Sequence, residues 1–153
     1  MTKPFPLDTL LNLAHLKNDA ATRKLGKLNH QEQTAQSRLA ALQEYRHDYQ
    51  QQFETAEKNG MAPADMRNFQ SFIDRLDQAI RQQQQEISKA HSSVQKGRHE
   101  LLDSTRKMKS FDTLAQRHVE SERKLEAKSE QRLQDEQSGR FAARHAADKE
   151  PAK

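Results

Sequence analysis

The chain of 153 residues is 33% hydrophobic and 31% charged, and it contains no Cys, no Trp and only four Gly. So few apolar residues exclude a broad globular core, and the lack of Cys excludes disulfides and thiolate metal sites. The net charge of +4 comes from 26 basic and 22 acidic residues that are well mixed along the chain, which argues against nucleic-acid binding. Two classes of chain remain: a disordered one, and elongated helices with a narrow apolar seam.

A first helix is predicted over residues 7–59, after an N-terminal extension of residues 1–6. Apolar residues recur in steps of four and three from residue 7 to residue 56, and twelve of these fifteen positions are apolar. A heptad pattern sustained over this length favours a coiled-coil helix over disorder. The fifteen positions are Leu7, Leu11, Ala14, Asn18, Ala21, Leu25, Leu28, Glu32, Ala35, Leu39, Leu42, Arg46, Tyr49, Phe53 and Ala56.

A turn is predicted over residues 60–62, within the segment "EKNGMAPADM". This is the one place where Gly and Pro come together inside a long run of helix formers. Gly60 after Asn59 suits the end of a helix, where glycine tolerates the left-handed conformation. Pro63 suits the first turn of the next helix, and Asp65 places a favourable negative charge near its start.

A second helix is predicted over residues 63–137, followed by a flexible tail over 138–153. Its seam repeats the same spacing from residue 66 to residue 115, again with twelve apolar residues in fifteen. The expected fold is all-α: a long antiparallel two-helix coiled-coil hairpin, paired to about residue 118, from which the rest of the second helix projects. The second seam is Met66, Phe69, Ile73, Leu76, Ile80, Gln83, Ile87, Ala90, Val94, Gly97, Leu101, Ser104, Met108, Phe111 and Ala115.

Two seams of equal length that fold back about Met61 also predict which residues face each other. Facing residues then have numbers that sum to 122. Leu25 is expected opposite Gly97, so that a large side chain faces a small one. Asn18 is expected opposite Ser104, in a polar layer that fixes the register.

One flank of the hairpin near the turn is apolar. Tyr45, Phe72 and Ala79 occupy the g positions there, whereas the e positions are polar, and in an antiparallel pair the two g flanks lie on the same side. The aromatic side chains either cover the edge of the core, as lone exposed apolar residues often do, or form a docking patch for a partner. The docking patch so predicted comprises Leu42, Tyr45, Tyr49, Phe72, Leu76 and Ala79.

A second pair of g-flank residues, Leu10 and Leu114, lies near the open end of the hairpin. Either packing between the helix ends or a partner site accounts for such a pair. The seven His residues lack the spacing of metal ligands, and the sequence contains no Gly-rich phosphate loop. No catalytic residue, cofactor, metal or small-molecule ligand is therefore expected. No membrane span is expected either, since no apolar run reaches about 18 residues.

Several segments follow one another in a specific order. They are "FPLDTLLNLA", "LQEYRHDYQQQF", Asn59-Gly60, "NFQSFIDRLDQAI" and, near the end, "RLQDEQSGRFAARHA". Taken together they resemble the flagellar type III export protein family FliJ over nearly the whole chain. The pair of segments on either side of Asn59-Gly60 is the most specific part of the resemblance.

This resemblance implies a cytoplasmic, stalk-like coiled coil that associates peripherally with the inner membrane at the flagellar base. It implies three kinds of partner: the hexameric export ATPase FliI, the gate subunit FlhA, and export chaperones. The gate-contacting surface of the family maps onto the docking patch, with the polar Gln83 as a departure from the family pattern. The ATPase-binding region of the family lies toward the termini and maps onto Leu10, Leu114, Arg117, Arg123 and Lys124.

Three alternatives stay open. An injectisome-type secretion stalk has the same architecture, and its neighbouring genes would separate it from a flagellar one. A generic coiled-coil adaptor or holdase chaperone would suppress the aggregation of many clients and show no preference for a ring ATPase. A basic helical nucleic-acid binder would show a steep salt dependence, and the mixed charge of the chain argues against it.

Overall fold

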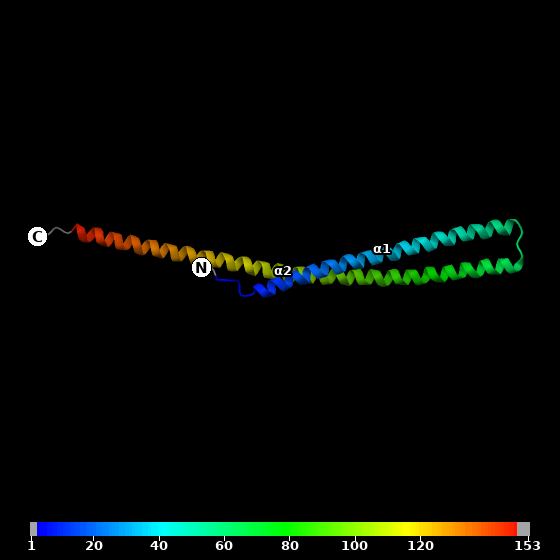
Figure 1. The fold of residues 1–153 in the computed structure, drawn as a ribbon, viewed down its shortest axis with the longest axis horizontal. Coiled ribbons are helices and arrows are strands. Elements are labelled where there is room, and N and C mark those ends of the chain that lie inside the picture. The colour runs from blue at the N-terminus through cyan, green and yellow to red at the C-terminus, as the bar shows by residue number, and fades with distance from the viewer. Residues whose placement is uncertain (1–2, 150–153) are drawn as a thin grey trace. The chain divides into compact units, whose positions relative to one another are not determined.

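Two long helices make up most of the computed structural model, which describes residues 3–149 (Figure 1). Helix α1 spans Asp8–Lys58 and helix α2 spans Pro63–Asp148, and the described residues contain no strand. The expectation of an all-α fold with two long helices packed against each other is confirmed. Within the described part of the chain, neither helix has a stretch apolar enough to cross a membrane.

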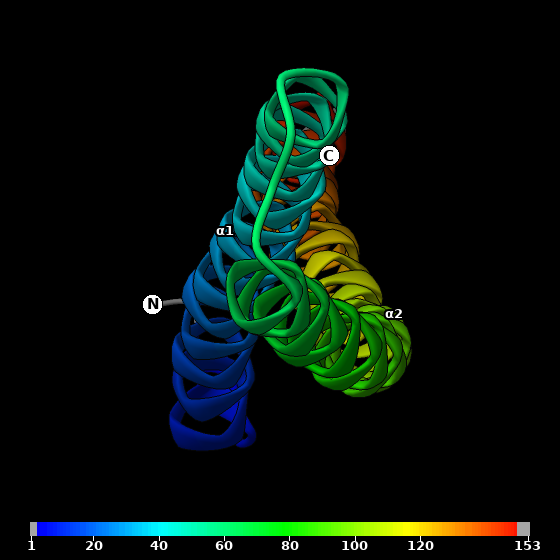
Figure 2. The ribbon, with the colours of Figure 1, turned by 90° about the vertical axis from the view of Figure 1, so that its right-hand side faces the viewer.

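The turn between the helices depends on Gly60. Its φ of 88° lies in the left-handed region, which L side chains rarely adopt. The Asn59 amide donates to the Thr55 carbonyl at 3.2 Å and the Gly60 amide donates to the Glu57 carbonyl at 3.2 Å, so two carbonyls at the end of α1 are satisfied. α2 begins at Pro63, whose missing amide hydrogen is not needed in a first turn. Figure 2 shows the turn as it joins the two helix ends.

The heptad positions form the contact between the helices. All thirty seam positions are buried or half-buried, the polar ones and Leu7, which precedes α1, included. Val94 is the most enclosed of them, with 1% of its surface exposed. Burial is thus confined to one stripe on each helix, as expected for a chain with so few apolar residues.

The described residues divide into two units, in each of which α1 and α2 pack together. Unit 2 comprises residues 17–105 and contains the turn. Its helices are antiparallel, since the rings of Phe53 and Phe69 lie 5.6 Å apart near the turn and Lys24 Nζ lies 3.0 Å from Glu100 Oε2 far from it. Figure 1 shows these parts of the helices side by side, in cyan for α1 and green for α2.

The register of unit 2 is visible at Gly97. A Cβ atom on Gly97 would lie 4.0 Å from Leu25 Cα and 2.9 Å from Leu28 Cδ1. Leu25 therefore stands opposite Gly97 as predicted, and the two leucines fill the space that the glycine leaves open.

Asn18, which is expected opposite Ser104 in a polar layer, makes its hydrogen bond to the residue that follows Ser104. Asn18 Nδ2 donates to Thr105 Oγ1 at 2.8 Å. Ser104 Oγ is buried and has no hydrogen-bond partner among the described residues. Thr105 follows Ser104 and lies on the e flank of α2. The Asn18 side chain therefore reaches the edge of the contact between the helices, where it meets Thr105.

Unit 1 comprises residues 3–16 and 106–149 of the described chain. Its N-terminal segment packs on α2, because the ring of Phe5 lies 5.6 Å from the ring of His118. His118 Nε2 donates to the Lys3 carbonyl at 2.9 Å, since a carbonyl can only accept. The Lys3 amide in turn donates to Glu122 Oε2 at 3.4 Å. Residues 3–7 therefore extend the contact with α2 as far as Glu122, one turn past the expected limit near residue 118.

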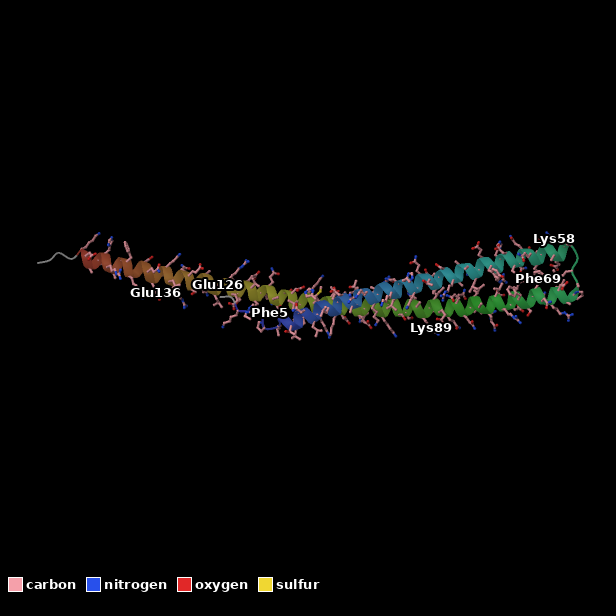
Figure 3. The ribbon with its side chains drawn as sticks, viewed as in Figure 1. Phe5, Lys58, Phe69, Lys89, Glu126 and Glu136 are labelled. Carbon is pink, nitrogen blue, oxygen red and sulfur yellow. The ribbon has the colours of Figure 1, made fainter. Side chains whose placement is uncertain are left out.

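The second helix does not end at residue 137. It continues as helix through Gly139 to Asp148, into the segment expected to be a flexible tail. A single exposed glycine costs a helix only about 1 kcal/mol relative to alanine, and the alanines and arginines that follow are good helix formers. All residues from 123 to 149 are exposed; Figure 3 labels Glu126 and Glu136 on this stretch. The last part of the predicted tail, residues 150–153, lies outside the described residues.

Candidate partner-binding surfaces

Five aromatic rings form a continuous ladder beside the turn of unit 2. Successive ring centroids lie 6.2 Å apart for Tyr45–Phe72, 4.4 Å for Tyr49–Phe72, 5.0 Å for Tyr49–Phe69 and 5.6 Å for Phe53–Phe69. The ladder runs from the core to the surface, since Phe53 is 9% exposed and Tyr45 is 55% exposed. Tilted and edge-on ring pairs at these separations are favourable, so the outer ring is held by the inner ones. Figure 3 labels Phe69 in this region.

The structure brings the six residues of the predicted docking patch into unit 2, but it exposes them unequally. Tyr45 is open to solvent, whereas Leu76 is only 8% exposed and belongs to the core. The other four, Leu42, Tyr49, Phe72 and Ala79, are half-buried. The accessible part of the patch is therefore Tyr45 together with the outer edges of these four side chains.

A shallow hollow adjoins Tyr45 on the same flank. It is lined by Arg38, Ala41, Leu42, Tyr45 and Gln83. The sequence interpretation did not include Arg38 and Ala41. Their spacing to Tyr45, seven and four residues along one face of a helix, is the signal by which they could have been found.

Gln83, expected only to interrupt the apolar patch, has a structural role. Its Nε2 donates to the carbonyl of Ala35 on the other helix at 2.9 Å. A half-buried amide that is satisfied in this way costs little stability, because the hydrogen bond offsets its loss of water. Gln83 also lines the hollow beside Tyr45.

The opposite, e flank of unit 2 carries polar side-chain contacts that join the two helices. Arg46 Nε donates to Asp77 Oδ1, and its Nη2 lies 3.4 Å from Asp77 Oδ2. This hydrogen bond lowers the pKa of Asp77; burial opposes the shift, and the charges of Arg46 and Arg81 add to it. Further along the same flank, His91 Nδ1 lies 3.1 Å from Glu32 Oε1. A partner that approached here would have to displace contacts already made within the chain.

The residues proposed by resemblance for the ATPase lie in unit 1 and are all exposed. Leu10 is 45% exposed and Leu114 is 41% exposed. Side chains this exposed have a larger accessible surface than packing between the helix ends alone would leave. Arg117, Arg123 and Lys124 lie further along α2 and are exposed as well. The sequence interpretation missed three neighbouring exposed residues of this unit: Leu13, Leu16 and Val119.

Within residues 3–149, no group of three His, Asp or Glu side chains is placed to hold a metal ion. The surfaces described above are exposed flanks and shallow hollows, which offer contact area to another macromolecule.

The family of flagellar FliJ proteins matches residues 2–147 of the sequence. The chain belongs to this family. Among known members, the FliJ protein of Salmonella typhi is 28% identical over 138 residues, which cover 90% of this chain and 94% of that protein. The FliJ protein of Escherichia coli strain K12 is 26% identical over the same share of both chains.

A solved structure has the same fold. It is that of a protein described as a YscO homologue from Chlamydia trachomatis, with a TM-score of 0.61, 14% identity, and coverage of 97% of this chain and 100% of that one. At 14% identity, the likeness shows a shared fold and carries no conclusion about function. Membership of the FliJ family supports the assignment of the chain as a component of flagellar type III protein export.

Proposed function

We propose that this FliJ-family chain links the hexameric export ATPase FliI to the gate subunit FlhA and receives export chaperones. Its role in this proposal is mechanical and connective: it carries a contact from one partner to another and performs no bond chemistry. It works in the cytoplasm, held at the inner membrane only through the export apparatus at the flagellar base. The family match and the presence of separate exposed surfaces in units 1 and 2 support this role.

The observation that carries the gate contact is the exposed ring of Tyr45. A tyrosine that is 55% exposed, and that is held by Phe72 at 6.2 Å, is a rigid amphipathic group available to a partner. Such rings are enriched among the residues that dominate interface energies. The opposite flank offers no comparable group, since Arg46 and Asp77 already bind each other there.

The ATPase contact is proposed for the exposed residues of unit 1. Leu10 and Leu114 supply apolar area, and Arg117, Arg123 and Lys124 supply positive charge. An apolar centre with a charged rim has the composition of a protein interface.

The test of this proposal measures both contacts in the same variant. Tyr45→Ala with Phe72→Ala should weaken binding to the cytoplasmic domain of FlhA at least tenfold, because it removes the rigid outer rings. Stimulation of FliI ATPase turnover should stay at the wild-type level, because unit 1 is unchanged. Gln43→Ala with Gln70→Ala is the matched control, since both glutamines are exposed on the e flank.

Two outcomes would contradict the proposal. Unchanged affinity for FlhA in the double variant would remove the gate contact from this surface. Failure of the wild-type chain to raise FliI turnover would remove the ATPase contact. Circular dichroism should show that helicity is retained; a variant that unfolds would instead assign these rings to the core.

A further inference from the structure

The turn of unit 2 forms one side of a hollow that lies between the two helices. Met61 and Ala62 line this hollow from the turn. Both helices complete its lining, with Tyr49 and Ala56 on α1 and with Asp65, Asn68 and Phe69 on α2. We call it the turn hollow. Because α1, α2 and the turn all line it, the turn hollow is more than the outer face of one helix.

The turn hollow continues the docking patch toward the turn. Tyr49 belongs to both, and the centroid of its ring lies 5.0 Å from that of Phe69, which also lines the hollow. On its other side the ring of Tyr49 lies 4.4 Å from the ring of Phe72, so the aromatic ladder joins the two surfaces. A partner that contacts Tyr45 and Phe72 therefore lies beside the turn hollow.

The lining of the turn hollow is apolar inside and negative at its mouth. Its half-buried members are Tyr49, Ala56, Met61 and Phe69. Asp65 is exposed, and it is the one Asp, Glu, Lys or Arg residue among those that line the hollow. Lys58, labelled in Figure 3, does not line it, and Arg67 Nε donates to the Pro63 carbonyl at 3.4 Å. The charge that this hollow presents to a partner is therefore that of Asp65.

This combination fits a long cationic side chain. Such a side chain lays its apolar stem along an apolar surface and keeps its charged head at the edge. A cation near the face of a Tyr or Phe ring is attracted by the ring. Arginine also donates two parallel hydrogen bonds to a carboxylate, which a lysine cannot do. An aliphatic side chain would leave Asp65 unused, and an acidic one would be repelled by it.

We propose that the turn hollow receives an arginine side chain of the gate subunit FlhA, whose stem lies against Tyr49 and Phe69 and whose guanidinium binds Asp65. The side-chain oxygen of Asn68 is a further acceptor for this group. The inference rests on the proposed function, since continuity with the docking patch is what brings FlhA to the hollow. Asp65 is then a specificity residue: the docking patch supplies apolar area, and the charge at one end of it fixes how the partner lies along the flank.

The experiment measures binding of the full chain to the cytoplasmic domain of FlhA by isothermal titration calorimetry. Asp65→Asn should weaken binding about three- to tenfold, the range expected for an ion pair with a cation–ring contact. This loss should shrink in about 0.5 M salt, which screens the pair. Asp65→Glu should keep most of the affinity, because it keeps the carboxylate. Asp74→Asn is the matched control: Asp74 is exposed on α2 outside the hollow, and the change in charge is the same.

A second variant fills the hollow without removing the charge. Ala62 is exposed and lies between the helices in sequence, so Ala62→Leu should leave both helices intact by circular dichroism. It should weaken binding to FlhA as well, because the added side chain occupies the space of the arginine stem. Arg→Ala variants of FlhA then identify the partner residue. One of them should weaken binding to the wild-type chain and have little further effect on binding to Asp65→Asn, as expected for two groups in contact.

Several results would overturn the inference. They are equal affinity of Asp65→Asn and the wild type, an equal loss in Asp74→Asn, and Arg→Ala variants of FlhA whose losses all add to that of Asp65→Asn. Weaker binding of Ala62→Leu together with unchanged binding of Asp65→Asn would identify an apolar side chain as the occupant.

Asp65→Asn keeps every residue of the docking patch. If Tyr45→Ala with Phe72→Ala weakens binding to FlhA and Asp65→Asn does not, the turn hollow is excluded and the gate contact stands. If neither variant weakens binding, the gate contact on this flank is excluded as well. Stimulation of FliI turnover by Asp65→Asn should equal that of the wild type, because unit 1 is unchanged.

Discussion

At the scale of single residues, Arg46 is the clearest exception to the apolar seam. It occupies a core position of the heptad but reaches the e flank, where Asp77 accepts its hydrogen bonds. The sequence places Arg46 in the seam and Asp77 on the flank, but the pattern of apolar residues does not say that they meet. Side-chain length decides this, because an arginine keeps its apolar stem at the seam while its guanidinium lies at the edge.

The Arg46–Asp77 pair predicts a specific dependence of stability on pH. The folded pKa of Asp77 is lowered, mainly by the hydrogen bond from Arg46. Its contribution is therefore complete above the unfolded value of about 4 and is lost as pH falls through the lower folded value. Asp77→Asn should lower the free energy of unfolding by roughly 0.5–1 kcal/mol near pH 7, a figure reduced because both side chains are about one-third exposed.

Urea unfolding followed by circular dichroism at a series of pH values checks this prediction. The difference between wild type and Asp77→Asn should shrink as the pH falls from about 5 toward 2. Asp74→Asn is the control, since Asp74 is exposed on the outer side of the same helix. A difference that is the same at every pH would show that the carboxylate charge is not what stabilises the pair.

At the scale of the helices, most of the fold could be predicted from the sequence. The heptad spacing of the apolar residues and the residue types at the turn both indicate the same two-helix hairpin. The thirty seam positions follow from the heptad pattern, and Gly60 and Pro63 mark where the chain reverses. The end of α2 could not be predicted in the same way. Residues 138–148 have no seam to satisfy, and the helix propensity of single residues in "SGRFAARHAAD" does not by itself fix an end point.

The site was predicted less completely than the fold. The aromatic flank was visible in the sequence because Tyr45 and Phe72 are conspicuous at g positions. Arg38 and Ala41, which line the hollow beside Tyr45, were not, since such residues on a helix in a charge-rich chain look like ordinary solvated residues.

The close approach of the helices at Gly97 predicts a contrast between two glycines. Gly97→Leu should destabilise the protein by about 1–3 kcal/mol, because the new side chain meets Leu25 and Leu28 in a packed layer. Gly26→Leu should stabilise it by up to about 1 kcal/mol, because Gly26 has open space around it and leucine is the better helix former. Urea unfolding of both variants measures the difference, and similar values for the two would contradict the packing described for Gly97.

At the scale of the whole molecule, the structure predicts that the two ends of the chain contribute unequally to stability. Deletion of residues 123–153 should leave the melting temperature nearly unchanged while total helicity falls, since residues 123–149 bury no side chain. Deletion of residues 1–6 should lower the melting temperature by a few °C, because it removes the contacts of Lys3 and Phe5 with α2. Thermal scans by circular dichroism compare the two truncations. A larger loss from the C-terminal deletion would contradict the burial found in unit 1.

The hydrogen bond from Gln83 has a consequence for how the family can diverge. Its acceptor is a main-chain oxygen, which every amino acid at position 35 supplies. Substitutions at position 35 therefore need no matching change at position 83, and the two columns of a sequence alignment should vary independently. Arg46 and Asp77 recognise each other through their side chains, so loss of one during evolution should be followed by replacement of the other.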